Sequence, residues 1–163
     1  MKKYSQLLLG FAVILVGLLG ISSQAHAVTH YVQSSTPTIF VHGWGSSSHA
    51  EEKMANAARD AGVTKTIVRA NVDRKGKVTF NHQIPANAVN PIVEVNLEDN
   101  KLSAYQDDYT QGYHHGGGYV KNVVLALEKQ HHYKQINLVG HSMGNLEIIN
   151  YINDNVNDKS LPQ

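Results

Sequence analysis

The chain has 163 residues, with 14 Lys and Arg, 13 Asp and Glu, and a formal net charge of +1 at pH 7. Cysteine is absent, so disulfide scaffolds and thiolate metal sites are excluded. The charges are balanced and no basic patch is interleaved with aromatic residues, so nothing indicates a nucleic-acid partner. The length is sufficient for one domain with a hydrophobic core.

The first 27 residues have the pattern of a secretory signal peptide. Lys2 and Lys3 form a basic start, residues 7–21 form an apolar run, and Ala25-His26-Ala27 is a cleavage site of the A-x-A type. The apolar run is short for a membrane span, which needs about 18 residues or more. We therefore expect cleavage after Ala27 and a secreted or cell-surface protein; an uncleaved anchor is the alternative.

After a polar segment at 28–36, which we expect to be flexible, strand and helix patterns alternate along residues 37–163. Short β-branched or alternating runs predict strands, and apolar positions three or four residues apart predict helices. We expect a hairpin over 66–80 and a flexible loop around residues 114–118, after a partly helical start. The other predicted elements are strands at 37–41, 92–97 and 136–139 and helices at 49–61, 119–130 and 145–152. This order predicts an α/β fold with a mainly parallel sheet.

The stretch Gly140-His141-Ser142-Met143-Gly144 matches the pattern G-x-S-x-G. A predicted strand precedes it and a predicted helix follows it, which is the context of a nucleophile elbow. The pattern therefore predicts Ser142 as a catalytic nucleophile at the start of a helix, where developing negative charge is stabilised. The alternative is a glycine-rich turn in which Ser142 only caps the helix.

An acyl-transfer serine also needs two backbone N–H groups that bind the carbonyl oxygen as it becomes negative. One comes from the residue after the nucleophile, here Met143, and the other from a loop after an earlier strand. His42-Gly43-Trp44-Gly45 follows the first predicted strand, so we expect the N–H of Trp44 to be the second donor. The alternative is a loop whose tryptophan merely packs on the core.

Residues 38–45 and 137–145 together resemble the α/β-hydrolase superfamily. More closely, they resemble the secreted cell-surface α/β-hydrolases of Gram-positive bacteria, as do residues 90–93 and Asp99-Asn100. The resemblance spans about residues 37–155. It implies a mainly parallel sheet with helices on both faces, Ser142 as nucleophile, Trp44 and Met143 as oxyanion donors, and no cofactor or metal. The implied substrate is a small-molecule or lipid acyl compound, whose acyl and leaving groups stay open.

The chain departs from the superfamily pattern after the elbow. The triad order there is Ser, then Asp or Glu, then His, but no histidine follows His141. The later acids, Glu147, Asp154 and Asp158, are too close in sequence to orient a distant base. We therefore expect a hydrolase domain truncated after the elbow helix and inactive by itself; a non-catalytic remnant or binding module with this fold is the alternative.

Two further expectations follow from this departure. The strand at 136–139 would have an unpaired apolar edge, which favours self-association or pairing with a second chain. His42, His82, His114 and His115 are the earlier histidines considered as bases, but His42 is expected to be structural and His114-His115 solvated. A zinc site of His114, His115, His131 and His132 is disfavoured, because adjacent histidines point apart.

Overall fold

The computed structural model describes residues 31–162, so the predicted signal peptide lies outside the described residues. From residue 32 onward the chain forms one compact unit. No helix within the described part is long and apolar enough to cross a membrane.

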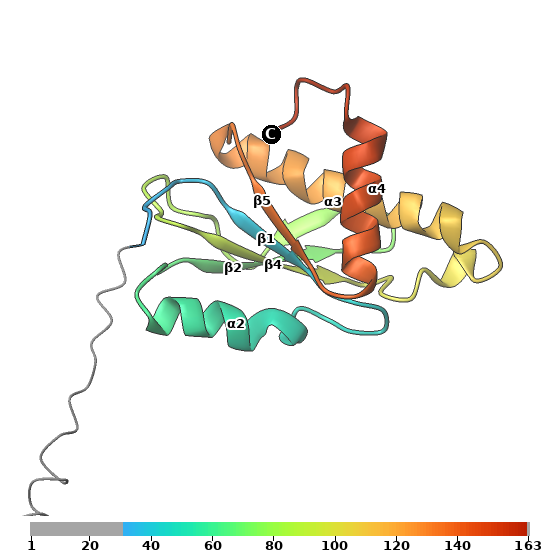
Figure 1. Cartoon of the computed structure of the whole chain (residues 1–163), viewed down its shortest axis with the longest axis horizontal. Helices are drawn as coiled ribbons and strands as arrows, with labels where there is room; N and C mark the ends of the chain where they lie inside the picture. Colours follow the sequence, from blue (N-terminus) through green and yellow to red (C-terminus); the bar gives the residue numbers. More distant parts are fainter. Residues whose placement is uncertain (1–30, 163) are drawn as a thin grey trace, which may run out of the picture. The chain divides into compact units, whose positions relative to one another are not determined.

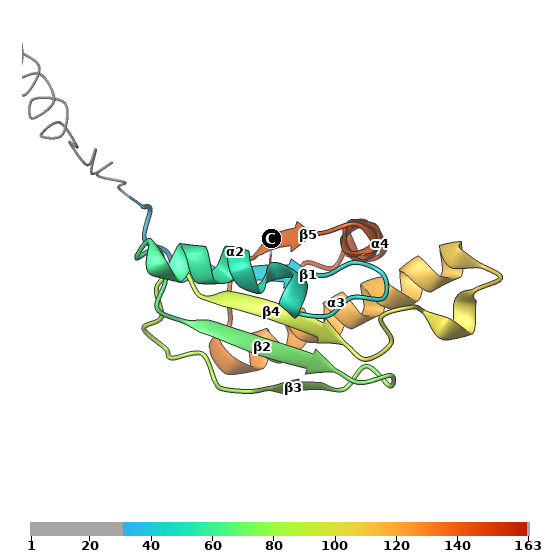
Figure 2. The ribbon, with the colours of Figure 1, turned by 90° about the horizontal axis from the view of Figure 1, so that it is seen from below.

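The unit is built on a five-stranded sheet with the strand order β3-β2-β4-β1-β5. All neighbouring strands pair in parallel except β2 and β3, which form the antiparallel hairpin predicted from the sequence. Among the described residues β5 pairs with β1 alone and is therefore an edge strand (Figure 2). The strands are β1 at Thr38–Val41, β2 at Ile67–Val72, β3 at Val78–Phe80, β4 at Ile92–Leu97 and β5 at Asn137–Gly140.

Helices cover both faces of the sheet, as predicted (Figure 1). Helix α2, His49–Asp60, lies on one face, whereas α3, Tyr109–His131, and α4, Met143–Asn155, lie on the other. A short 3-10 helix, η1, spans Ser103–Tyr105 before α3. The fold class predicted from the sequence is confirmed.

The main core lies between the sheet and the α3–α4 face. In β2 the side chains alternate between half-buried and buried, so that Val68, Ala70 and Val72 enter this core. Helix α3 contributes Val120, Val123, Val124 and Leu127, all fully buried. The face under α2 has only a small apolar cluster, made by Phe40, Ala55 and Ile92. The two catalytic segments predicted from the sequence therefore stand on strands β1 and β5 that the main core holds in place.

The prediction of a flexible loop around residues 114–118 is wrong, because these residues are inside α3, which begins at Tyr109. Gly116 and Gly117 are buried where α3 crosses α4. A methyl group on Gly116 would lie 2.6 Å from Glu147 Oε1, and one on Gly117 would lie 2.8 Å from the Tyr151 nitrogen. Close packing of the two helices thus requires glycine here and outweighs its low helix propensity.

Candidate active site

Ser142 stands at a sharp turn between β5 and α4. Its backbone has φ 52° and ψ −120°, a conformation that a residue with a side chain rarely adopts. The flanking glycines permit the turn: a methyl group on Gly140 would lie 2.7 Å from the Asn145 nitrogen, and one on Gly144 would overlap the Val41 carbonyl oxygen. The strand–turn–helix geometry predicted for the motif is present, and it exposes Ser142 at the C-terminal end of the strand.

The loop after β1 approaches the elbow from the neighbouring strand. A methyl group on Gly43 would lie 2.9 Å from Ser142 Cβ, so glycine is what allows the loop to come this close. Trp44 follows on this loop, and Met143 is the first residue of α4, where a backbone N–H has no partner within the helix. Within the described part of the chain neither N–H donates a hydrogen bond. Neither predicted oxyanion donor is therefore occupied by another group of the described residues.

His42 holds this loop in place. Its side chain is fully buried, its Nδ1 lies 2.9 Å from the Gly43 carbonyl oxygen, and its Nε2 accepts a hydrogen bond of 3.1 Å from the Leu97 N–H. The acceptor role of Nε2 places the proton on Nδ1, which donates to Gly43. Burial lowers the pKa of His42, so the ring stays neutral. With both nitrogens engaged, His42 is a structural residue rather than a base for Ser142.

Replacing His42 with alanine is expected to destabilise the domain by about 2–4 kcal/mol, because it leaves a cavity and two unpaired buried backbone groups. Since the pKa of His42 is lowered by folding, the unfolded state binds more protons below pH 6.5, and stability falls there in the wild type. The His42→Ala variant lacks this titrating group, so its stability falls less than that of the wild type as the pH drops below 6.5. Urea unfolding at pH 5 and pH 7 measures both effects, and His49→Ala on the exposed start of α2 is the control. Equal stability of the two variants would contradict the role of His42.

An open pocket of about 520 Å³ lies over Ser142. Its lining residues are Trp44, Tyr109, Tyr113, Ser142, Met143, Asn145 and Leu146. Tyr109 and Tyr113, one turn apart on α3, are stacked with ring centroids 6.2 Å apart. Neither sequence motif predicts these tyrosines in the site; their four-residue spacing, which places both on one face of a helix, is the signal that could have found them. The pocket thus adds α3 to the two segments predicted from the sequence.

A comparison with the sequence profiles of known families shows the family of the chain. The profile of a family described as alpha/beta hydrolases of unknown function (DUF915) matches residues 25–163. The chain belongs to this α/β-hydrolase family. A comparison with curated proteins gives no match.

Two solved structures resemble this chain. The product of the gene lin2722 from Listeria innocua is 26% identical with a TM-score of 0.67, and the match covers 80% of this chain and 48% of that one. A proposed cell surface hydrolase from Lactobacillus plantarum WCFS1 is 20% identical with a TM-score of 0.58, covering 69% of this chain and 43% of that one. The chain therefore spans about half the length of the structures it matches.

Within residues 31–162 no hydrogen bond joins the Ser142 hydroxyl to a histidine. His141 Nδ1 lies 4.0 Å from Oε1 of the buried Glu51, and burial raises the pKa of that carboxyl group. His114 is paired with Asp154 at 2.8 Å. Asp154 lies twelve residues after Ser142, which is about 18 Å along the axis of α4. The described residues therefore bring the predicted nucleophile and the predicted oxyanion donors together without a histidine that is hydrogen-bonded to Ser142.

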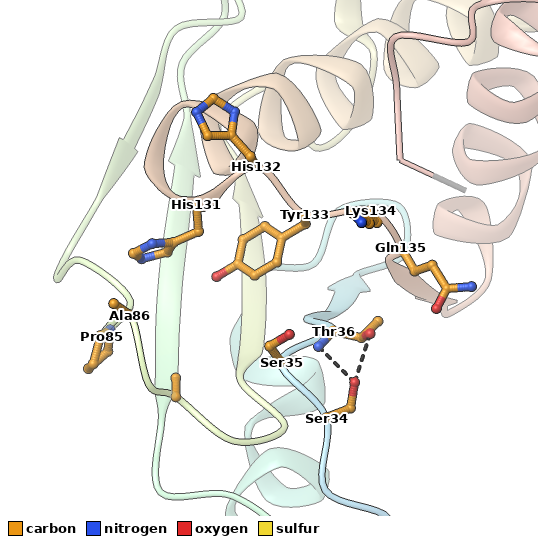
Figure 3. Close-up of a pocket in the computed structure, with 11 residues that line it drawn as sticks. Ser34, Ser35, Thr36, Pro85, Ala86, His131, His132, Tyr133, Lys134 and Gln135 are labelled. Atoms are coloured by element: carbon orange, nitrogen blue, oxygen red, sulfur yellow. Dashed lines mark hydrogen bonds between the residues drawn. The ribbon is translucent and has the colours of Figure 1, made fainter.

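Figure 3 shows a second pocket, of about 490 Å³. Some of its lining residues lie shortly before β1 and β5 in the sequence, so the pocket lies at the ends of these strands opposite to Ser142. Its lining is polar and comes from residues 34–36, 85–88 and 131–135. Ser34 Oγ donates to Thr36 Oγ1 at 2.8 Å and accepts from the Thr36 N–H at 3.0 Å (Figure 3). His131 Nε2 is bound to the Ile84 carbonyl, and no group of three or more His, Asp or Glu in the described residues is placed to hold a metal ion. This pocket carries no catalytic set.

Proposed function

We propose that this chain carries the nucleophile-bearing part of a secreted or cell-surface serine hydrolase that cleaves ester or related acyl bonds. The observation that carries the proposal is the exposed Ser142 in a strained elbow, beside two backbone N–H groups without partners in the described residues. The predicted signal peptide and the cell-surface description of the Lactobacillus plantarum protein support the location. Family membership supports the reaction class.

In the proposed reaction Ser142 Oγ attacks the carbonyl carbon of the substrate and gives its proton to a base. The carbonyl oxygen becomes negative and is bound by the N–H groups of Trp44 and Met143, near the N-terminus of α4. Collapse of this intermediate breaks the bond to the leaving group and leaves an acyl-serine, which water then hydrolyses. We place the base and its orienting acid outside the described residues, because those residues hold no histidine bonded to Ser142.

A fluorophosphonate probe tests the proposal, since it reacts with activated serines. We expect the protein isolated from its source cells, with the base that the proposal requires in place, to gain the mass of one phosphonyl adduct as fluoride leaves, and Ser142→Ala to abolish the labelling. The matched control is Ser103→Ala, which removes an exposed serine in η1 and is expected to leave the labelling of Ser142 unchanged. Intact-mass spectrometry with peptide mapping is the readout. If the correctly folded protein from its source cells stays unlabelled although the base is present, the proposal is overturned.

The absence of a bonded base within residues 31–162 favours a second candidate, a non-catalytic binding module that retains the hydrolase fold. In that case Ser142→Ala changes neither the folding of the domain nor its binding to any partner. The labelling experiment separates the two candidates, because only an activated serine reacts rapidly with the probe.

We also propose that the chain self-associates through the β5 edge and the adjoining face of α4. An exposed apolar stripe on α4 is formed by Leu146, Ile149 and Ile152, and Val156 extends it at the C-cap. The neighbouring strand β5 has no charged side chain to oppose pairing. Sedimentation velocity is expected to show species above the monomer mass, and Ile152→Lys to return the protein to a monomer. Leu125→Lys, at an exposed leucine on α3, is the control. A monomeric wild type that instead binds a separate chain at this edge would overturn self-association.

A further inference from the structure

The pocket over Ser142 gathers large apolar side chains that are unusually exposed. Trp44 is 54% exposed, Tyr109 is 43% exposed and Leu146 is 40% exposed. They come from three separate elements, the loop after β1, the first turn of α3 and the first turn of α4. Single exposed apolar residues are ordinary, but their convergence around one hydroxyl group is typical of a ligand site.

The aromatic walls of this pocket are held in position before any ligand arrives. Asp108 caps the start of α3 by accepting a hydrogen bond from the Gln111 N–H, which fixes the turn that carries Tyr109. Tyr113 packs against the main core. On the other side of the pocket, Lys101 Nζ lies 5.2 Å from the ring centroid of Trp44, a cation–π contact that orders the indole. Ordered walls reduce the entropy lost when a ligand binds.

The lining residues that the structure describes include no charged side chain. Their polar side-chain groups are the Ser142 hydroxyl, the Asn145 amide, the Trp44 indole N–H and the two tyrosine hydroxyls. A carboxylate placed among them would lose water without gaining an ion partner, whereas each methylene buried on the aromatic walls strengthens binding by about a factor of four. The ammonium group of Lys101 is already engaged with Trp44 at the rim.

From these walls we infer that the pocket selects esters with an uncharged, apolar acyl group, and that Tyr109 and Tyr113 are specificity-determining residues. The inference rests on the proposed function, because it takes the ester carbonyl to lie at Ser142. The acyl chain then runs between the indole of Trp44 and the stacked tyrosines of α3.

Trp44 is the single tryptophan of the chain, so its fluorescence reports directly on this pocket. The experiment titrates the Ser142→Ala protein with methyl hexanoate and with monomethyl adipate, which has the same chain length but ends in a carboxylate. We expect methyl hexanoate to bind at least tenfold more tightly. Tyr109→Ala and Tyr113→Ala, each added to Ser142→Ala, are expected to weaken its binding about three- to tenfold. Because Tyr109 is exposed, its truncation keeps the fold even if that of Tyr113 does not.

Tyr133→Ala in the same background is the control, because Tyr133 lines the pocket at the opposite end of the strands (Figure 3). Equal or tighter binding of monomethyl adipate would show that Lys101 recognises a negative charge and would overturn the inference. Unchanged fluorescence with both esters would overturn it as well. The serine-hydrolase proposal has its own failure outcome: methyl hexanoate binds to the Ser142→Ala protein, but the fluorophosphonate probe does not label the wild-type protein isolated from its source cells.

Discussion

Replacing Glu147 with glutamine is expected to stabilise the domain by about 3 kcal/mol at pH 7. Glu147 has 0% exposure, lies between α4 and Gly116 of α3, and neither of its carboxylate oxygens has a hydrogen-bond partner in the described residues. Burial, and secondarily the negative charge of Asp99, raises the pKa of Glu147 to about 8 from an ordinary value of 4.5. At pH 7 the folded state therefore holds a proton that the unfolded state has released, and this costs stability.

The sign of the pH dependence follows from the same pKa. Because the folded state binds the proton more tightly, the stability of the wild type falls as the pH rises from about 4.5 to about 8 and is level above that. Glu147→Gln removes this slope, since glutamine has a similar shape and no charge to lose. Urea unfolding at pH 5, 7 and 9 measures how the free energy of unfolding changes with pH, and Glu98→Gln at an exposed site is the control. A variant that is less stable at pH 7 and keeps the wild-type slope would contradict the expectation.

Gly144→Ala is expected to have the largest effect on the elbow, with a loss of about 3 kcal/mol or more. A methyl group at this position would overlap the Val41 carbonyl oxygen and approach the His42 carbonyl oxygen to 2.8 Å, so α4 could no longer start against β1. The elbow would open and Ser142 would move away from Gly43. Thermal unfolding followed by circular dichroism measures the loss.

Gly118→Ala supplies a matched control, because a methyl group on Gly118 would meet nothing within 4 Å. Gly118 is inside α3, where alanine is favoured over glycine, so this variant is expected to gain about 0.5–1 kcal/mol. The same substitution therefore acts in opposite directions at two glycines of one domain. Similar melting temperatures for the two variants would contradict the steric explanation of the elbow.

The features that the sequence predicted well are those with local signals. The short β-branched runs, the hairpin around Gly76 and the G-x-S-x-G turn each depend on residues close together in the chain, and the structure has all of them. The glycine-rich part of α3 was misassigned because its helical state depends on packing against Glu147 and Tyr151, about 30 residues away. A propensity argument over residues 114–118 cannot include that contact.

The same distinction between local signals and distant contacts applies to the candidate site. Ser142, Trp44 and Met143 follow from two motifs, although their catalytic roles remain predictions. Tyr109 and Tyr113 enter the pocket only because α3 begins ten residues earlier than expected. The hydrogen bond from Leu97 to His42 spans 55 residues, so no local pattern could have predicted the partner of that buried ring.

The pairing of β1 with β5 has a consequence for the order of folding. Thr38 and Asn137 are joined across 99 residues, and Val41 is in register with Gly140, directly before the elbow. Contacts between residues so distant in sequence close a long loop and tend to form late. The loop that carries Trp44 and the turn that carries Ser142 meet only when this last parallel pair is made. In a newly made chain the two segments of the predicted site would therefore stay apart until β1 and β5 pair, and the distance between Trp44 and Ser142 would report on that step of folding.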